Sequence, residues 1–232
     1  LNGKNGSCGI HRNPEPVAYF KGRIWNTVEW GSWGVSGHDA MVISADENSD
    51  LLDADSWSFS QPVRYDENWE GVPKGTSAGN IEGSLVVLSN KLYNIMRYDM
   101  TKLTPDHGLG IRYEVDTENP EAPLKYDGVI KLDGNHSKFM IKYSEKTGRF
   151  YTIISRITSD EQPYARNLLS LMESQDCESW VLKEDLLDYS QEDPKKVGFQ
   201  YVDFEIEGTH MQIGGDLAKK YRENHGCRNS GR

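Results

Sequence analysis

Residues Asn80 to Arg97 read NIEGSLVVLSNKLYNIMR, and this stretch decides the fold. Two apolar runs, Gly83 to Leu88 and Leu92 to Met96, are separated by a short polar turn, a pattern that predicts a β-hairpin. An acidic residue, Glu82, opens the first strand, and an arginine, Arg97, closes the second. The stretch therefore predicts one hairpin with a charge at each end.

The same pattern occurs twice more in the chain. Residues 13–30 read NPEPVAYFKGRIWNTVEW, and residues 136–156 read HSKFMIKYSEKTGRFYTIISR. An aromatic residue stands at the same place in the second strand of each copy, as Trp25, Tyr93 and Tyr151. Two further strand-like segments follow each hairpin, so each unit is expected to contain four antiparallel strands. Repeats of this kind, with short loops and few helices, are typical of an all-β propeller.

Together these repeats predict a single, partial propeller domain. We expect blades at about residues 11–66, 79–133 and 134–190, the start of a fourth at 197–213, and an irregular or short helical tail over 214–232. Because a propeller closes on itself to remove its sheet edges, this number of units predicts a piece of a longer five- or six-bladed protein, or a diverged C-terminal end. A β-sandwich is the alternative fold, but it does not predict repeated charge positions.

The composition argues against several functional classes. The 232-residue chain carries a formal net charge of −10 and has no clustered run of Lys and Arg, which argues against a nucleic-acid binder. No apolar run is long enough to span a membrane, and no signal peptide is visible. Because the first residue is leucine, the sequence leaves the localisation open.

Neither a metal nor a cofactor is expected from the sequence. Cys8, Cys177 and Cys227 lie far apart and form no C-x-x-C pair, so they indicate neither a disulfide framework nor a zinc site. The chain also contains no P-loop, H-E-x-x-H, G-x-S-x-G or G-x-G-x-x-G motif. These absences exclude the usual cofactor motifs.

Four ionisable residues are candidates for catalysis because they stand near the start of the first strand of a unit. They are Glu15, Glu82, His136 and Asp203. First strands line the central channel of a propeller, so these side chains are expected to converge. Glycoside hydrolysis needs two carboxyl groups on either side of the scissile bond. The alternative is that each carboxylate is solvated or paired with an arginine of a neighbouring blade.

Arginines and aromatic residues are candidates for substrate binding. Arg12, Arg97 and Arg156 stand beside the hairpins, and several guanidinium groups in one cavity would suit an acidic sugar. An ion pair with Glu29 or with the channel carboxylates is an equal alternative.

The loop WGSWGVSGHD at residues 30–39 adds Trp30, Trp33 and His38. Aromatic rings stack on sugar rings, and the glycines allow close approach. The two tryptophans could equally pack between blades.

The segments HRNPEP, GNIEGSLVVLSNKLYNIMRYD, GNHSKFMIKYSEKTGRFY, RNLLSLMESQDCESW and DPKKVGFQYVDF, between residues 11 and 207, resemble the sialidase-like (BNR-type) β-propeller glycoside hydrolases of carbohydrate-degrading bacteria. This resemblance implies exo-acting hydrolysis of glycosidic bonds at the channel mouth without a metal, in the periplasm or outside the cell. It also makes Tyr201 a candidate for substrate binding. The carboxylates at the strand starts also resemble five-bladed arabinanases and fructosidases, in which an acid, a base and a pKa-tuning carboxylate come from different blades.

The leading hypothesis is therefore a glycoside hydrolase acting on an oligosaccharide or glycan, with Glu15 and Glu82 as the carboxyl pair and Asp203 or His136 orienting substrate or water. A non-catalytic carbohydrate-binding propeller is the second hypothesis. A polysaccharide lyase acting on uronates is the third, and it would use His136 or Tyr201 as a base beside an arginine.

Overall fold

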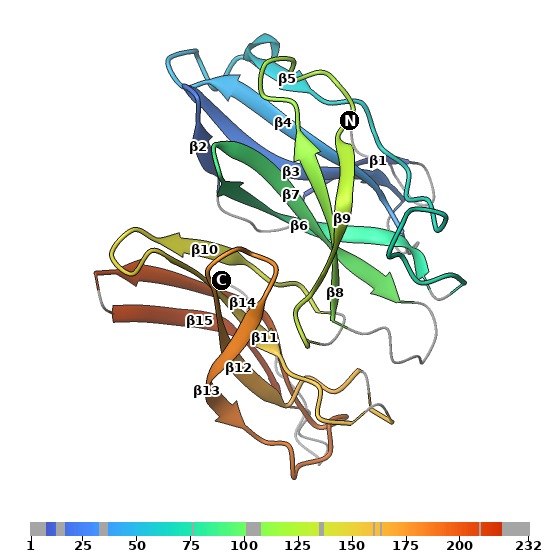
Figure 1. Cartoon of the computed structure of the whole chain (residues 1–232), viewed down its shortest axis with the longest axis vertical. Helices are drawn as coiled ribbons and strands as arrows, with labels where there is room; N and C mark the ends of the chain where they lie inside the picture. Colours follow the sequence, from blue (N-terminus) through green and yellow to red (C-terminus); the bar gives the residue numbers. More distant parts are fainter. Residues whose placement is uncertain are drawn as a thin grey trace, which may run out of the picture.

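The computed structural model describes residues 8–12, 17–32, 37–75, 77–100, 108–134, 137–159, 161–162, 164–208 and 210–219. Within these ranges the chain is all-β, and its strands form antiparallel sheets that follow one another along the chain. Figure 1 shows this succession, from the blue strands at the top, through the green strands in the middle, to the orange and red strands at the bottom.

The first sheet contains five strands, one more than the repeat predicts. It consists of β1 (Gly9–His11), β2 (Ala18–Phe20), β3 (Arg23–Gly31), β4 (Asp39–Asp46) and β5 (Trp57–Phe59), and a short 3-10 helix, η1 (Ala54–Ser56), precedes β5. The order is β1-β3-β4-β5, with β2 also paired to β3. Two short strands, β1 and β2, thus share the place of the single expected first strand.

The second sheet contains the hairpin that decides the fold. Its strands are β6 (Ser77–Leu88), β7 (Lys91–Met100), β8 (Leu109–Val115) and β9 (Lys125–Lys131), in that order. Leu88 pairs with Lys91, and the two residues between them, Ser89 and Asn90, have φ of 49° and 59°. Positive φ at both central residues is the geometry of a type I′ turn, which suits the twist of the flanking strands. The predicted hairpin is confirmed, with longer strands.

The third sheet repeats this order, and the last described strands form a pair. The third sheet consists of β10 (Ile141–Ser144), β11 (Arg149–Ser155), β12 (Leu168–Ser174) and β13 (Trp180–Asp188), and the pair consists of β14 (Val197–Glu207) and β15 (His210–Lys219). The tail expected to be irregular or helical from residue 214 is wrong for residues 214–219. They continue β15, because their backbone pairs with β14 from Val197 to Asp203.

Apolar side chains fill the spaces between successive sheets. One core cluster joins the first and second sheets, another joins the second and third, and a last one joins the third sheet to β14. Neighbouring residues of a strand point to opposite faces, so in β7 Met96 packs toward the first sheet and Ile95 toward the third. The second and third sheets therefore take part in packing on both of their faces, as stacked blades require.

The repeated aromatic residue occupies one structural position. Trp25, Tyr93 and Tyr151 are each the third residue of the strand that follows the first hairpin turn of their unit, in β3, β7 and β11. Trp25 is fully buried in the first cluster, and Tyr93 and Tyr151 pack against the second and last clusters. Each ring thus faces the sheet that follows in the chain, which explains its recurrence as packing.

Ion pairs bridge the same junctions nearer the surface. Lys21 in the β2–β3 turn lies 2.8 Å from Glu118, which belongs to the β8–β9 turn of the second sheet. Arg112 of β8 lies 2.9 Å from Glu178 in the third sheet, and Lys142 of β10 lies 2.6 Å from Glu205 of β14. Exposed pairs of this kind contribute about 0–1 kcal/mol each, so the apolar clusters dominate the junctions.

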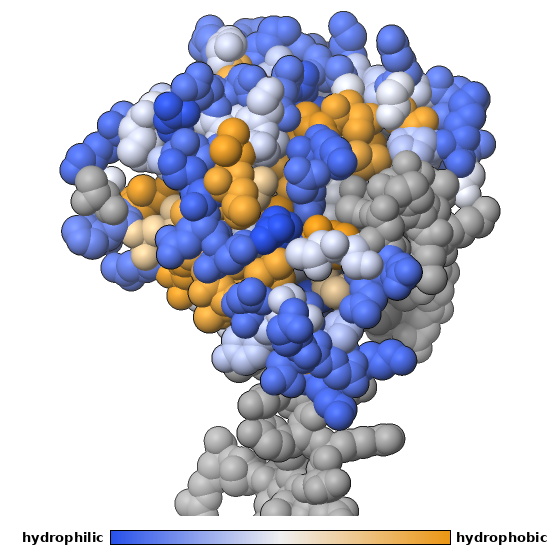
Figure 2. Space-filling model, turned by 60° about the horizontal axis from the view of Figure 1, so that its bottom comes forward, coloured by the Kyte–Doolittle hydropathy of each residue, from blue (hydrophilic) through white to orange (hydrophobic). Residues whose placement is uncertain are grey.

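The surface is mainly polar. Figure 2 shows one face, on which orange apolar patches alternate with blue polar side chains. In the part of the chain that the structure describes, no helix has the length and apolar character needed to cross a bilayer.

Candidate active site

Glu82 occupies a strained position in the first strand of the second sheet. The pairing of β6 with β7 shifts between Ile81 and Gly83, so Glu82 is the extra residue of a β-bulge, with φ of 52°. This left-handed conformation costs a non-glycine residue roughly 1–2 kcal/mol. Bulges re-aim side chains and are common beside active sites. The strain therefore marks Glu82 as a candidate functional residue.

Glu82 forms part of a charged network with β7. Arg97 Nη1 lies 3.3 Å from Glu82 Oε2, and the two side chains are only 11% and 13% exposed. Arg97 Nη2 lies 3.9 Å from Asp99 Oδ1, and the backbone N–H of Gly37 donates to Asp99 Oδ2 at 3.0 Å. The charges at the two ends of the predicted hairpin thus meet each other inside the protein.

A second buried carboxylate reaches Glu82 from the first sheet. The backbone N–H of Glu82 donates to Oε2 of Glu29 at 3.1 Å. The same oxygen lies 3.3 Å from Nδ1 of His38, and both Glu29 and His38 are buried. Glu29 occupies the place in β3 that Arg97 occupies in β7, six residues after the first residue of each strand.

Burial raises the pKa of the Glu82 carboxyl group above its usual range, because the low-dielectric surroundings disfavour the charged form. Arg97 acts in the opposite direction and lowers this pKa, and Glu29 raises it. Lys138 and Arg166 lower it to a smaller extent. The balance favours a protonated Glu82 at a higher pH than an exposed glutamate would allow.

Arg166 and Tyr201 belong to the same neighbourhood. Burial lowers the pKa of Arg166, Arg97 lowers it further, and Tyr201 and Glu82 raise it. The carbonyl of Arg166 accepts from the N–H of Phe199 on β14 at 2.7 Å. Tyr201 follows on that strand, at a second register shift and with φ of 50°. The strand β6 thus carries Glu82 near Arg97, and the strand β14 carries Tyr201 near Arg166. Both residues have a positive φ.

The other candidate residues described lie in different contacts. Arg12 Nε donates to Asn26 Oδ1 at 3.2 Å. Arg156 donates three hydrogen bonds to Asp185 of its own sheet, at 2.7, 2.9 and 3.3 Å. Asp203 lies 3.5 Å from Lys142 and its side chain is 61% exposed.

The aromatic candidates differ in exposure. Trp30 in β3 is 37% exposed and Tyr201 is 44% exposed, so each offers part of a ring to solvent. His38 is buried between Glu29 and the carbonyl of Ser32, 3.1 Å from its Nε2. Glu15, Trp33 and His136 lie outside the described residues.

Four charged residues of this network were not selected from the sequence as site residues: Glu29, Asp99, Lys138 and Arg166. The repeat contains a signal for Glu29, because it matches Arg97 in the aligned hairpins. Lys138 similarly lies six residues before the end of β10, as Glu82 does in β6. Asp99 stands two residues after Arg97 on β7, and so on the same face of the strand, a signal that the sequence contained. Arg166 has no such signal, since only the packing of the sheets brings it close.

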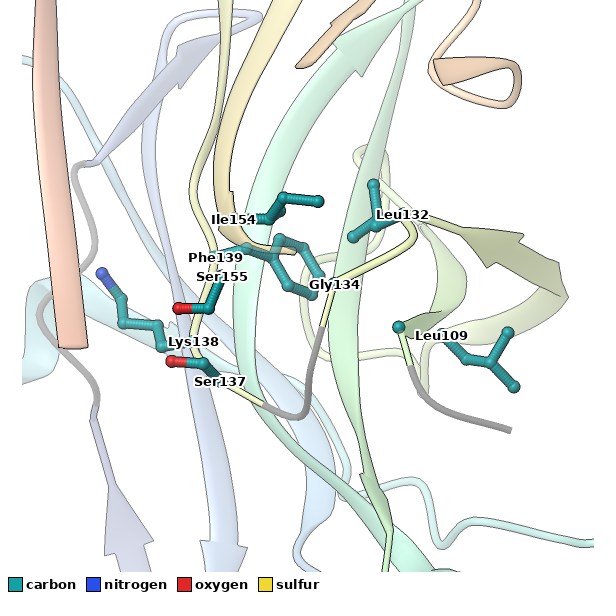
Figure 3. Close-up of a pocket in the computed structure, with 9 residues that line it drawn as sticks. Leu109, Leu132, Gly134, Ser137, Lys138, Phe139, Ile154 and Ser155 are labelled. Carbon is teal, nitrogen blue, oxygen red and sulfur yellow. The ribbon is translucent and has the colours of Figure 1, made fainter. Parts of the chain in front are cut away.

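A small cavity lies beside this network. It is lined by residues that include Ser137, Lys138, Phe139 and Ser155, and its volume is about 10 Å³. In Figure 3 the polar ends of Ser137, Lys138 and Ser155 point to one side and the ring of Phe139 to the other. This volume is near the minimum for one water molecule, so the cavity is too small for a sugar. Among the described residues, no group of three or more His, Cys, Asp or Glu side chains could hold a metal ion.

Comparisons with solved structures show which fold this is. An α-L-arabinofuranosidase from Lactobacillus brevis matches with a TM-score of 0.54 and 11% identity, over 90% of this chain and 66% of that chain. A family 117 glycoside hydrolase from Zobellia galactanivorans matches with a TM-score of 0.51 and 10% identity, over 92% and 70%. An exo-β-1,3-galactanase from Clostridium thermocellum matches with a TM-score of 0.50 and 14% identity, over 89% and 41%.

No protein-family model matches the sequence, and no curated protein matches it. At these low identities the structural matches establish the fold alone. The chain spans less than half of the galactanase and just under two thirds of the arabinofuranosidase. The expected fold class is confirmed: the chain is an all-β protein of antiparallel sheets, of which the second and third are four-stranded, similar to part of the propeller glycoside hydrolases.

Proposed function

We propose that this chain carries part of the active site of a propeller glycoside hydrolase, in which Glu82 is the proton donor. One observation carries the proposal. A carboxyl group with a raised pKa lies beside Arg97, on a strained bulge in the first strand of a sheet. Perturbed carboxyl groups in such positions are typical of catalytic acids. The similarity in fold to exo-galactanase and arabinofuranosidase structures supports the same class of substrate, a glycan cleaved from its end.

The proposed step follows the chemistry of glycosidases. Glu82 donates its proton to the glycosidic oxygen as the bond between that oxygen and the anomeric carbon breaks, and the leaving sugar departs as an alcohol. Glu82 is then a carboxylate, which Arg97 stabilises from 3.3 Å. A second carboxylate activates water or attacks the anomeric carbon. We assign this second role to Glu15, with His136 orienting substrate or water.

Glu29 is a poor choice for the second carboxylate. Its side chain is buried, and its Oε2 accepts from the N–H of Glu82 and contacts His38. Asp203 pairs with Lys142 at the exposed edge, so its proposed orienting role is tested separately, by Asp203→Asn. Retained turnover in that variant would remove Asp203 from the mechanism.

The finer, sialidase-like assignment is a proposal that rests on Arg97 and Tyr201. Both residues influence Arg166 electrostatically, so an anionic sugar would meet positive charge and a phenol in one place. The screen described next therefore includes sialosides and uronides beside arabinofuranosides and galactosides.

The test is a hydrolysis screen with aryl glycosides and oligosaccharides, comparing the wild-type chain with Glu82→Gln. We expect Glu82→Gln to lower kcat by roughly 10²- to 10⁴-fold on natural leaving groups. Glu205→Gln, which removes a carboxylate at the Lys142 junction, is the matched control and should keep kcat. Equal turnover by the wild type and Glu82→Gln would refute the role of Glu82.

A non-catalytic carbohydrate-binding propeller is the second candidate. It is favoured by the partly exposed rings of Trp30 and Tyr201, because exposed aromatic rings can stack on sugars without any catalytic carboxyl pair. Binding of a glycan in calorimetry without turnover of any substrate would support this candidate. An unsaturated uronide among the products would instead indicate a lyase.

A further inference from the structure

Glu29 is a buried carboxylate that contacts the neighbouring sheet. It lies near the end of β3, in the first sheet, and both contacts are made by Oε2: the N–H of Glu82 donates to it at 3.1 Å, and Nδ1 of His38 lies 3.3 Å away. A buried carboxylate is costly unless it is hydrogen-bonded and paired.

His38 is fixed from several directions. Its Nε2 lies 3.1 Å from the carbonyl of Ser32, and since a carbonyl only accepts, this nitrogen carries a proton and donates. Nδ1 lies 3.3 Å from Oε2 of Glu29, and it would donate to this oxygen only in the doubly protonated imidazolium form. The backbone N–H of His38 donates to the carbonyl of Asn80 at 2.8 Å, and Asn80 Nδ2 donates to the carbonyl of His38 at 2.8 Å. These bonds tie His38 to β6, two residues before Glu82.

Gly31 provides the space for this histidine. A Cβ atom added at Gly31 would lie 2.1 Å from Cδ2 of His38 and 2.4 Å from its Cγ, so any larger residue would displace the ring. The ring of His11 packs on the other side, with 4.9 Å between ring centroids. Nε2 of His11 lies 2.8 Å from the carbonyl of Gly31. The imidazole of His38 is thus held in one orientation against Glu29.

The backbone N–H that Glu29 accepts belongs to the strained residue Glu82. Glu82 has φ of 52° at the bulge, and a residue persists in such a conformation only when its surroundings hold it there. Glu29 accepts the backbone N–H of this residue. The direction of the Glu82 side chain depends on the same backbone angle, because the bulge determines where the Cβ atom points.

We propose that Glu29, which lies against His38, is a positioning residue that fixes the backbone of Glu82 in its left-handed bulge and so directs the Glu82 carboxyl group toward the substrate. The inference rests on the proposed function only for its effect on turnover. Its structural content, a hydrogen bond across two sheets that holds a strained residue, is measurable without any substrate.

The experiment compares Glu29→Ala with Glu29→Gln in the 232-residue chain. Alanine removes the acceptor, whereas glutamine keeps an amide oxygen that can accept from the Glu82 N–H and removes only the charge. We expect Glu29→Ala to lower kcat by roughly 10- to 100-fold with KM changed less than about threefold, as for a misplaced catalytic group. Glu29→Gln should keep kcat within about fivefold of the wild type, because its amide oxygen still accepts the Glu82 N–H. If the charge of Glu29 were what mattered, glutamine would not restore kcat.

The matched control is Glu173→Ala. Glu173 also has a largely buried side chain with polar contacts, to Arg149 and Tyr151, but it lies in the third sheet, away from the candidate site. Its replacement should leave kcat unchanged. A second variant, Gly31→Ala, displaces His38 without touching Glu29 and should lower kcat in the same direction. It also serves if Glu29→Ala does not fold.

The amide resonance of Glu82 gives an independent readout. In a ¹H–¹⁵N spectrum, the Glu82 amide proton should move upfield in Glu29→Ala and keep its position in Glu29→Gln. An unchanged amide shift in Glu29→Ala would overturn the proposal, and so would a loss of kcat in Glu29→Gln as large as in Glu29→Ala. If no glycan is hydrolysed by the wild-type chain, the proposed function fails, and the amide shifts still decide whether Glu29 holds Glu82.

Discussion

Arg97 Nη1 and Glu82 Oε2 lie 3.3 Å apart in the interior of the protein, although they stand at opposite ends of the hairpin sequence. The hairpin explains the contact, because its turn brings the two ends together: Ile81 pairs with Arg97 in the register of β6 and β7. The bulge at Glu82 then turns the carboxyl group toward the guanidinium group. This pair is the centre of the candidate site and the basis of the first two predictions.

Replacing Arg97 by methionine should destabilise the chain in a pH-dependent way. The change removes the positive charge that lowers the pKa of Glu82. Glu82 and Asp99 then lose the guanidinium group that lies near both of them. Breaking a buried ion pair costs roughly 3 kcal/mol or more. We expect this loss at pH 8 and a smaller one at pH 5, where Glu82 can take up a proton. Urea titrations at both values measure it.

Arg149→Met is the control for this experiment. Arg149 lies 3.5 Å from Glu173, but its side chain is about one third exposed, so the expected loss is below about 1 kcal/mol at either pH. Equal losses in the two variants would contradict a buried ion pair at Glu82.

Glu82→Gln should remove activity, and its stability relative to the wild type should increase as pH rises. The pKa of Glu82 is raised in the folded state, so the folded chain binds more protons than the unfolded chain between the unfolded and folded pKa values. The stability linked to this group is therefore present below the unfolded pKa and is lost as pH rises through the folded pKa. Glutamine stays neutral at every pH, so the difference in Tm between Glu82→Gln and the wild type should shift in favour of the variant from pH 4 to pH 8. A shift in the opposite direction would contradict the raised pKa.

Trp25→Ala should destabilise the junction between the first and second sheets. Trp25 is fully buried in the cluster that joins them, and truncating a buried Trp costs about 3–5 kcal/mol. Tyr19→Ala in the neighbouring strand β2 is the control, because Tyr19 is 66% exposed. This change should alter the free energy of unfolding by no more than about 0.5 kcal/mol. Chemical denaturation measures both. Similar losses would contradict the packing role of the repeated aromatic residue.

Asp176→Asn should lower stability at neutral pH but not in strong acid. The backbone N–H groups of Ser179 and Glu178 donate to Asp176 and hold its pKa at about 2. A depressed pKa contributes stability above the unfolded pKa, and this stability is lost as pH falls through the folded pKa. The Tm difference from the wild type should thus be largest near pH 7 and vanish near pH 2. Asp55→Asn, in the exposed helix η1, should change Tm little at either pH.

Much of the fold could be predicted because its signals are local. The hairpins at Lys21, Ser89 and Ser144 appear where apolar runs meet turn residues, and the recurring aromatic residue marks equivalent strands. The fifth strand of the first sheet and the strand over residues 214–219 were missed. β1 is three residues long, too short to show an alternating pattern of apolar and polar residues. The end of β15 shows no such alternation and depends on pairing with β14.

The candidate site was only partly visible. Glu82 and Arg97 were found because they close the ends of a repeated hairpin, whereas Arg156 and Asp203, chosen on the same ground, lie in pairs with Asp185 and Lys142. A charged residue at a strand end can be located from the sequence, but the residue with which it forms an ion pair cannot.

The hairpins, the succession of blade-like units and the places of Glu82 and Arg97 at the hairpin ends followed from the sequence, because turn chemistry and alternating side chains act between residues close in the chain. The left-handed bulge at Glu82, the approach of Glu29 and His38 from the first sheet, and the nearness of Arg166 became visible only in the folded chain. These relationships depend on the packing of one sheet on the next, which joins residues more than 40 positions apart.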